Sequence, residues 1–218
     1  VHVGVLEEEC RALNKRFICL HTLHRPYVIL KWAQTADGFI DIARDCGTPL
    51  IISTHLTKQL VHQQRAENMA IMVGTRTVIL DNPKLLNTRW SGRNPIRITL
   101  DRHNILPTDS RIFSNESPTI VYRENTEWKY ILEDLAHRNI HSVLVEGGAT
   151  LLQHILDSAI FDEVHIEVSQ HPLPTEGTTP QGVKAPIYSF QSIPKIIDGN
   201  RIYIEPHQAP DSQSITRS

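Results

Sequence analysis

The sequence predicts an α/β fold, in which a mostly parallel central sheet is flanked by helices and carries a C-terminal antiparallel hairpin. Apolar runs alternate with amphipathic runs as far as residue 168, the order expected of parallel strands joined by helices. Residues 142–152 read as a buried strand that turns tightly into a helix. Finally, Asp198-Gly199-Asn200 separates two short apolar runs, which is a hairpin signal.

Composition excludes several classes of protein. The 218 residues are 40% hydrophobic with a net charge of −2, which fits a globular domain with no general attraction to nucleic acid or anionic membranes. No apolar run approaches the ~20 residues of a membrane span, and the N-terminus has no signal-peptide pattern, so we expect a cytoplasmic protein. Three cysteines without C-x-x-C spacing, and histidines without acidic or thiol partners, predict neither a disulfide framework nor a metal site.

The two ends of the chain differ from its middle. Residues 4–17 form a helical pattern with acidic residues first and basic residues last, as the helix dipole favours. Because the chain enters this helix directly from Val1, we expect residues 1–23 to be the terminal helix and linker of a larger polypeptide. The main domain is expected at 24–206, and the polar tail at 207–218 is expected to be disordered.

The first elements of the main domain are a strand and a loop. Residues 26–35 are mostly apolar and read as a strand, which the Asp37-Gly38 turn closes. Residues 39–50 are expected to be a loop.

A helix is predicted next. Ser53 is expected to cap it, and the helix is expected to end near Glu67. Its apolar side is expected to carry Leu56, Leu60 and Val61.

The later elements follow the same logic of apolar strands and periodic helices. In chain order they are a strand at 70–73, a short helix at 75–80, strands at 96–100 and 119–122, a helix at 127–138, a strand at 142–145, a helix at 150–157, a strand at 163–168, a loop at 172–186 and hairpin arms at 193–197 and 201–205. Trp32, Trp90 and Trp128 are expected to be packing residues.

The turn after the strand at 142–145 carries the strongest functional signal. Gly147 and Gly148 let backbone N–H groups approach a ligand closely, and the helix N-terminus that follows favours an anion such as a pyrophosphate. Glu146 lies at the carboxyl end of the strand, where open α/β sheets bind ligands. The alternative is that the two glycines form an ordinary turn.

Three segments together resemble a known family: Lys31 with the turn that follows it, the segment 75–83, and the segment 145–151. The chain resembles the reductase half of the bifunctional riboflavin-biosynthesis deaminase/reductase over about residues 4–206. The residues before 15 resemble the last helix of that family's deaminase domain, whereas the zinc-deaminase signature is absent.

The resemblance implies a dihydrofolate-reductase-like fold and a homodimer, with a deaminase domain in the same polypeptide. It implies NADPH-dependent reduction of 5-amino-6-(5-phosphoribosylamino)uracil, in which hydride reaches C1′ of the sugar through a ring-opened imine and the ribosyl group becomes ribityl. Lys31 and Glu146 are then the expected catalytic residues.

Further site residues come from the same resemblance. The family's NADP contacts match Ala33, Ile51, Thr77, Asp81, Gly148, Ala149, Thr150, Leu151, Leu152, Gln153 and His154. Its substrate contacts match Pro49, Arg65, Leu85 and Glu146.

One further substrate arginine is expected just after the Asp-Asn-Pro turn. Counting places Thr88 there, whereas a one-residue insertion places Arg89 there, and chemistry favours Arg89. Arg65 and Arg89 would then clamp the substrate's 5′-phosphate, and Glu146 would accept hydrogen bonds from the uracil or its amino group.

Several assignments keep an alternative. Pro49 and Ile51 stand where the family often has serine and tryptophan. Arg102 either meets the 2′-phosphate of NADPH or is a solvated arginine at a strand end. Lys31 is either a proton donor in the cleft or a strand lysine that reaches solvent.

Arg65 and Asp81 also have structural alternatives. Arg65 lies near the end of a predicted helix, where a cation complements the helix dipole. Asp81 precedes Asn82-Pro83 and is suited to capping that turn.

Two other functions compete with the pyrimidine reductase. A reductase of the same fold acting on a pterin or dihydrofolate-like substrate would need a carboxylate in the first helix, and residues 54–65 contain none. A non-catalytic nucleotide-binding module would bind NADPH without turning over the pyrimidine.

Overall fold

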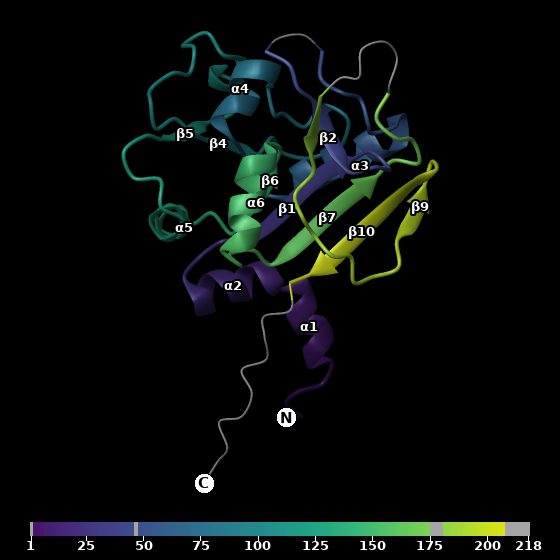
Figure 1. Cartoon of the computed structure of the whole chain (residues 1–218). Helices are drawn as coiled ribbons and strands as arrows, with labels where there is room; N and C mark the ends of the chain where they lie inside the picture. The colour runs from purple at the N-terminus through teal and green to yellow at the C-terminus, as the bar shows by residue number, and fades with distance from the viewer. Residues whose placement is uncertain (1, 46–47, 175–180, 208–218) are drawn as a thin grey trace.

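The computed structural model describes residues 2–45, 48–174 and 181–207, and within them one large sheet organises the chain (Figure 1). Its eight strands follow the order β5-β4-β3-β6-β1-β7-β10-β9. The strands from β5 to β7 are parallel to their neighbours, whereas β10 runs antiparallel to both β7 and β9. The predicted α/β class with a C-terminal hairpin is therefore confirmed. The tail predicted to be disordered lies outside the described residues from position 208 on.

The helices are α1 (Glu7–Leu13), α2 (Lys15–Leu23), α3 (His55–Glu67), α4 (Thr75–Asp81), α5 (Trp128–His137) and α6 (Ala149–Asp157), with a 3₁₀ turn at Arg111–Phe113. The strands are β1 (Tyr27–Gln34), β2 (Phe39–Ile42), β3 (Ala70–Val73), β4 (Ile96–Leu100), β5 (Thr119–Tyr122), β6 (Ser142–Glu146), β7 (Glu163–Val168), β8 (Gly182–Lys184), β9 (Lys195–Ile197) and β10 (Asn200–Pro206). Among the helices of the described residues, none has the length and apolar character of a membrane span.

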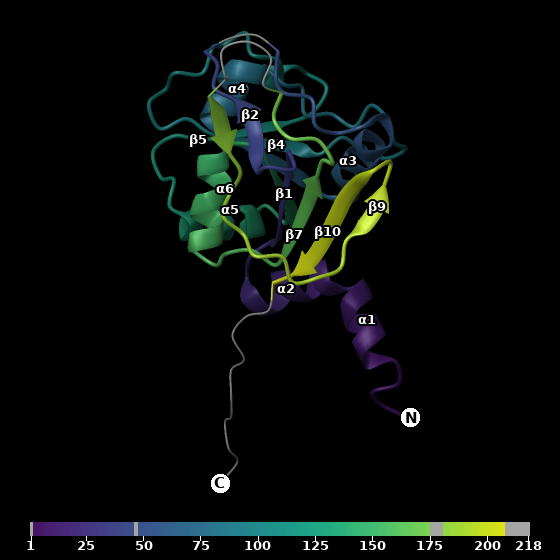
Figure 2. The same cartoon turned by 45° about the vertical axis from the view of Figure 1, so that its right-hand side comes forward.

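The central strand β1 is buried on both faces. Val28, Leu30 and Trp32 pack into the main apolar core, which α5 and α6 close from one side (Figures 1 and 2). Tyr27 and Ile29 point to the other face, where Cys19 of α2 and Leu144 of β6 meet them. A parallel strand buried on both faces needs a nearly continuous apolar run, which residues 26–35 provide, and the strand predicted there is confirmed.

The start of α3 differs from the prediction. Thr54, not Ser53, caps the helix: its hydroxyl accepts from the Thr57 backbone N–H at 3.2 Å, and the Thr57 hydroxyl accepts from the Thr54 backbone N–H at 2.8 Å. The Ser53 hydroxyl instead donates to a carboxylate oxygen of Glu167 at 2.6 Å. The prediction of Ser53 as the cap was wrong because its hydroxyl is held by a residue far along the chain.

The face that α3 presents also differs from the prediction. Leu56 is 49% exposed, whereas Thr57 is 1% exposed. Toward the sheet α3 also presents Gln64, which bonds to His165, and Arg65, which bonds to Glu146. The helix packs through polar groups because the sheet beneath it carries charged residues.

A small second sheet replaces two predicted loops. Phe39–Ile42 forms β2 inside the expected loop 39–50, and it pairs antiparallel with β8 inside the expected loop 172–186 (Figure 2). Both loop predictions were wrong in these parts, because each short strand depends on a partner more than a hundred residues away.

Single-residue expectations had mixed outcomes. Trp32 and Trp128 are buried as expected, whereas Trp90 lies in a surface loop and is 45% exposed, so its predicted packing role was wrong.

The cysteines lie in different surroundings: Cys19 is buried, Cys10 is exposed, and Cys46 lies outside the described residues. Burial raises the pKa of the Cys19 thiol to about 11.

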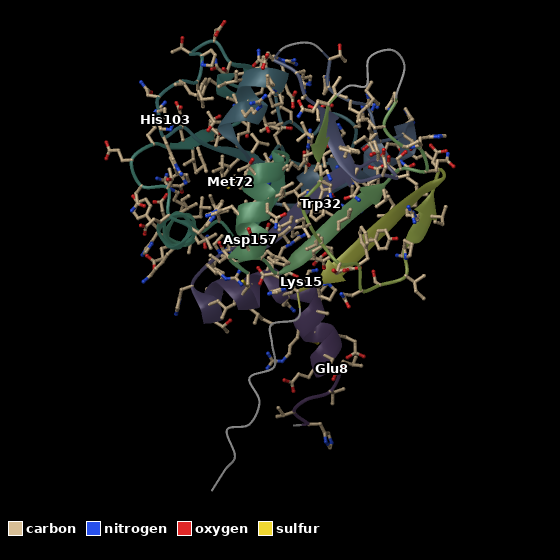
Figure 3. All side chains as sticks on the ribbon, viewed as in Figure 1. Glu8, Lys15, Trp32, Met72, His103 and Asp157 are labelled. Atoms are coloured by element: carbon tan, nitrogen blue, oxygen red, sulfur yellow. The ribbon has the colours of Figure 1, made fainter. Side chains whose placement is uncertain are left out.

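Glu163, the first residue of β7, ties the N-terminal helices to the sheet. Lys15 of α2 and His165 both bond to its carboxylate, and the Tyr27 hydroxyl donates to it at 2.9 Å. Lys15 lies by the N-terminal end of β7 (Figure 3). Burial works to raise the pKa of Glu163, but the hydrogen bonds from His165 and Lys15 outweigh it and lower that pKa to about 2.

This depressed pKa predicts an acid-sensitive contribution to stability. Since the ordinary pKa is 4.5, the contribution is complete above that pH and is lost as pH falls toward 2. We expect Glu163→Gln to lower the free energy of unfolding at neutral pH by about 3 kcal/mol. Its free energy of unfolding is expected to vary less than that of wild type between pH 4.5 and 2, as measured by urea denaturation.

Glu133→Gln, at an exposed position of α5, is the matched control and is expected to follow wild type. If the Glu163→Gln and wild-type curves run parallel through the acid range, the ionised Glu163 cluster does not stabilise the fold.

Candidate active site

The carboxyl ends of β1, β3, β4 and β6 meet at one edge of the sheet, the edge toward which β7 points in Figure 1. A cavity of about 1290 Å³ opens there, lined by Lys31, Val73, Leu100 and Glu146 from those four strands. The β2–β8 sheet forms part of its wall through Ile40 to Ile42 and Val183. Since sites for small molecules usually occupy ~300–1,000 Å³, this cavity has room for two ligands side by side.

Lys31 lies on the cavity wall, not on the outer surface. It stands opposite Glu146 in the β1–β6 register and opposite His165 in the β1–β7 register. Burial lowers the pKa of Lys31, and the charge of Arg65 acts in the same direction, whereas Glu146 and Glu167 oppose the shift. Of the two alternatives left by the sequence, the cleft position is the one observed.

Arg65 and Glu146 form a two-point ion pair across the floor of the cavity. Arg65 donates to the two carboxylate oxygens of Glu146 at 2.7 and 3.3 Å, and to the Leu86 carbonyl at 3.2 Å. Burial works to raise the pKa of Glu146, but Arg65 outweighs it and the pKa is lowered. Glu146 is therefore held as a carboxylate.

Of the other predicted substrate residues, some line the cavity and one does not. Arg89 lines the cavity, while Thr88 points its backbone N–H at His62 Nδ1, 3.1 Å away. The geometry therefore brings Arg89, not the side chain of Thr88, to the site. Pro49 and Leu85 line the cavity as well, and Leu85 adopts a left-handed backbone with φ of 55°.

Two polar side chains of the cavity were not among the expected site residues. Lys58 and His62 line the cavity from α3 together with Arg65. Their spacing of four and three residues places all three on one helical face, a signal that was readable in the sequence. Burial lowers the pKa of His62, and the nearby charges of Arg65 and Arg89 act in the same direction.

The glycine turn forms the opposite side of the cavity. Gly147 and Gly148 have φ of 77° and 76°, in the left-handed region that glycine adopts without strain. Gly148 is the N-cap of α6, and no side chain of the described residues caps that helix. Its first N–H groups are thus available to a ligand in the cavity.

The predicted cofactor residues of α6 fall into two groups. Ala149, Thr150, Leu151 and His154 line the cavity. Leu152 is fully buried in the core, and Gln153 bonds to Asp157 and to the Ile187 backbone N–H, both at 2.7 Å. A helix shows one face to the cavity, so a run of seven consecutive residues cannot all reach it.

The remaining predicted cofactor residues share the cavity wall: Ala33, Ile51, Thr77, Asp81 and Arg102. Asp81 is ion-paired with Arg44, which also bonds to Asp41. Arg102 follows β4 next to His103, which lies on the outer rim of the molecule (Figure 3). Within the described ranges, no group of three or more His, Cys, Asp or Glu residues is placed to hold a metal ion.

Comparison with known proteins agrees with this geometry. The family model described as the RibD C-terminal domain matches residues 26–171. The riboflavin biosynthesis protein RibD of Aquifex aeolicus is 34% identical over 192 residues, which cover 78% of this chain and 53% of that protein. The chain thus spans about half the length of the RibD relatives that it matches.

A shorter relative is covered more fully. The 2,5-diamino-6-ribosylamino-4(3H)-pyrimidinone 5′-phosphate reductase of Methanothermobacter thermautotrophicus is 32% identical over 168 residues, covering 65% of this chain and 76% of the relative.

Solved structures show the same fold. A diaminohydroxyphosphoribosylaminopyrimidine deaminase/5-amino-6-(5-phosphoribosylamino)uracil reductase from Thermotoga maritima superposes with a TM-score of 0.76 at 31% identity, covering 94% of this chain and 63% of that one. Dihydrofolate reductase from Enterococcus faecalis superposes with a TM-score of 0.51 at 11% identity, covering 84% of this chain and 97% of that one. The predicted dihydrofolate-reductase-like fold is confirmed.

The ion pair on the cavity floor yields a stability prediction. Arg65→Ala leaves the buried Glu146 carboxylate without its cation, so we expect the free energy of unfolding to fall by about 3–5 kcal/mol. The exposed pair of Arg138 and Asp134 on α5 serves as control, and Arg138→Ala is expected to cost less than about 1 kcal/mol. Equal losses in the two variants, measured by chemical denaturation at neutral pH, would contradict a buried pair.

Proposed function

The chain belongs to the RibD C-terminal domain family, and we propose that it is an NADPH-dependent reductase of 5-amino-6-(5-phosphoribosylamino)uracil, converting its ribosyl group to ribityl. One observation carries the proposal: a single cavity joins the Lys31, Arg65 and Glu146 cluster to the open N-terminus of α6. The first is suited to a polar pyrimidine and the second to a dinucleotide.

The family implies a nicotinamide cofactor, and the cavity fits one. Backbone N–H groups at Gly148 and Ala149 would hold the pyrophosphate, with the Thr77 side chain behind the glycines. Arg102 and His103 at the end of β4 would meet the 2′-phosphate, which makes NADPH our choice over NADH. When bound, the cofactor supplies hydride, and the protein supplies orientation and electrostatics.

The substrate would occupy the other half of the cavity. Arg89 and Lys58 form a cationic rim suited to the 5′-phosphate, and His62 lies beside them in the cavity. Arg65 shares its guanidinium with Glu146, so its contribution to phosphate binding acts together with that pair. The Glu146 carboxylate, held ionised, would accept hydrogen bonds from the N–H groups of the pyrimidine.

Lys31 would supply the proton. Reduction of the imine adds hydride to C1′ and a proton to the neighbouring nitrogen, and the ammonium of Lys31 is the proposed donor of that proton. Its position between the strands, opposite Glu146, holds it at the cavity wall. A pKa lowered by burial makes the ammonium a stronger acid than a solvated lysine.

The competing functions fit the cavity less well. From α3 the cavity receives Lys58, Val61, His62 and Arg65, and none of these described side chains is a carboxylate. A folate-like substrate would lack its expected carboxylate partner, whereas a phosphorylated substrate finds cations. A non-catalytic module would bind NADPH but leave NADPH absorbance unchanged when the pyrimidine is added, and that assay tests the proposal.

The assembly is also proposed from the family. We propose a deaminase domain as the partner within the full-length protein, and a homodimer as the assembly. The exposed Ile193 and Ile196, which lie before and within the edge strand β9, support an apolar contact at that edge.

The proposed binding of the cofactor's pyrophosphate by the backbone at Gly148 and Ala149 is tested by Gly148→Ala. The new Cβ would lie 3.5 Å from the Thr77 hydroxyl, so the protein has space for it, but it would add bulk at the turn proposed to approach the pyrophosphate and force a left-handed alanine. We expect a loss of stability of about 1–2 kcal/mol and an NADPH Kd raised about tenfold or more, equivalent to about 1.4 kcal/mol.

Gly38→Ala is the matched control for this variant. Gly38 has φ of 85° and nothing near its Cβ position, and it lies in the β1–β2 turn. It is expected to lose similar stability while NADPH affinity, measured by calorimetry, stays at the wild-type value. Equal changes of the NADPH Kd in the two variants would show that Gly148 is an ordinary turn residue.

The proton donor is tested by Lys31→Met. Methionine keeps much of the aliphatic stem, so we expect the fold and NADPH binding to persist. We expect kcat to fall about 10²-fold or more, the scale for loss of a positioned acid. A variant that retains over half of the wild-type kcat would show that Lys31 takes no part in the chemical step.

A further inference from the structure

A second carboxylate lies behind Lys31 and was not among the expected site residues. Glu167 is on β7, two residues beyond His165, the register neighbour of Lys31. Since side chains alternate along a strand, Glu167 and His165 share the sheet face that carries Lys31. Glu167 is 4% exposed and does not line the cavity, so it supports the site from behind.

Glu167 is held in place by two neutral donors. The Ser53 hydroxyl donates to one carboxylate oxygen at 2.6 Å, and the Asn200 side-chain amide donates to the other at 2.6 Å. Asn200 is itself 2% exposed and also donates to the Ile52 carbonyl at 3.4 Å. These contacts fix the carboxylate but do not neutralise its charge.

The charges of the cluster balance only when Glu167 is counted. Arg65 and Lys31 are cations, and Glu146 and Glu167 are anions. Arg65 is bonded to Glu146, so the negative charge of Glu146 is shared between Arg65 and Lys31, and Glu167 is the second carboxylate that acts on Lys31. Without Glu167 the buried cluster would carry an unbalanced positive charge, and a buried cation without a partner deprotonates.

The neighbouring charges on the same face are already paired. His165 bonds to Glu163 and to Gln64 of α3, and Glu163 also binds Lys15. The Glu163 carboxylate is thus already bonded to Lys15 and His165 and is not the partner of Lys31.

We propose that Glu167 is a positioning residue that keeps Lys31 protonated, and so able to donate a proton, while Arg65 occupies Glu146. The direction of the electrostatics agrees: Glu146 and, after it, Glu167 raise the pKa of Lys31 against the effect of burial. The role of Lys31 in catalysis rests on the proposed function, whereas its electrostatic coupling to Glu167 does not.

The coupling is tested directly by titrating Lys31 in the 218-residue chain labelled with ¹³C at the lysine Cε atoms. The Lys31 resonance is assigned by its absence in Lys31→Met. In Glu167→Gln, which keeps the shape of the side chain, we expect the pKa of Lys31 to fall by about one to three pH units. The basic limb of the kcat profile, measured with NADPH and the phosphoribosylaminopyrimidine, is expected to move by the same amount.

The control is Glu205→Gln on β10. Glu205 is equally buried and is held by the Tyr188 and Ser192 hydroxyls, but it lies on the opposite face of the sheet, beside Val164. It is expected to leave the Lys31 titration and the kcat profile in place.

Glu167→Asp is the milder variant. It keeps the charge but withdraws it by one methylene, so the pKa of Lys31 is expected to fall by less than in Glu167→Gln. An unchanged Lys31 titration in the folded Glu167 variants overturns the inference, and so does a kcat that falls equally at every pH. A shifted Lys31 titration in a chain without reductase activity supports the coupling and contradicts the proposed function.

Discussion

The ion pair between Arg65 and Glu146 is the interaction on which the site depends. A carboxylate at the buried end of β6 is costly unless a cation accompanies it. That requirement brings the last turn of α3 onto the sheet and makes the sheet-facing side of this helix polar. The floor of the cavity, the ionised state of Glu146 and the position of α3 all follow from this one contact.

The two faces of the sheet consequently differ in polarity. The face under α5 and α6 is apolar, so the periodic spacing of Trp128, Ile131 and Leu135 was enough to predict α5 from the sequence. The face under α3 carries the charged residues of β1, β6 and β7. The sequence predicts an apolar stripe in α3, whereas the structure turns Gln64 and Arg65 toward the sheet, because helical periodicity does not reveal which polar residues will be buried.

Some features of the site could likewise be predicted from the sequence, and others could not. The glycine turn and Glu146 were readable because backbone conformation and a strand end are local features, and Lys31 stood out in an apolar run. The β2–β8 wall, the Arg65–Glu146 bond and Glu167 were not readable, because each depends on segments that meet only after folding. His62 and Lys58 are an intermediate case, since their helical spacing with Arg65 was visible but their exposure to a cavity was not.

The geometry of the cluster is set mainly by strand register. Lys31, Glu146 and Glu167 come from three neighbouring parallel strands, and the hydrogen bonds of β1 to both β6 and β7 fix their relative positions. A slip of one residue in β1 would turn Lys31 into the apolar core and place Leu30 or Trp32 at the position that Lys31 holds opposite Glu146. Leu30 and Trp32, on either side of Lys31 in the strand, are buried in the apolar core on the other face of the sheet. Their burial makes the slip costly and so keeps the ammonium of Lys31 at the site. The hydrophobic core and the polar cluster are thus two consequences of the same register.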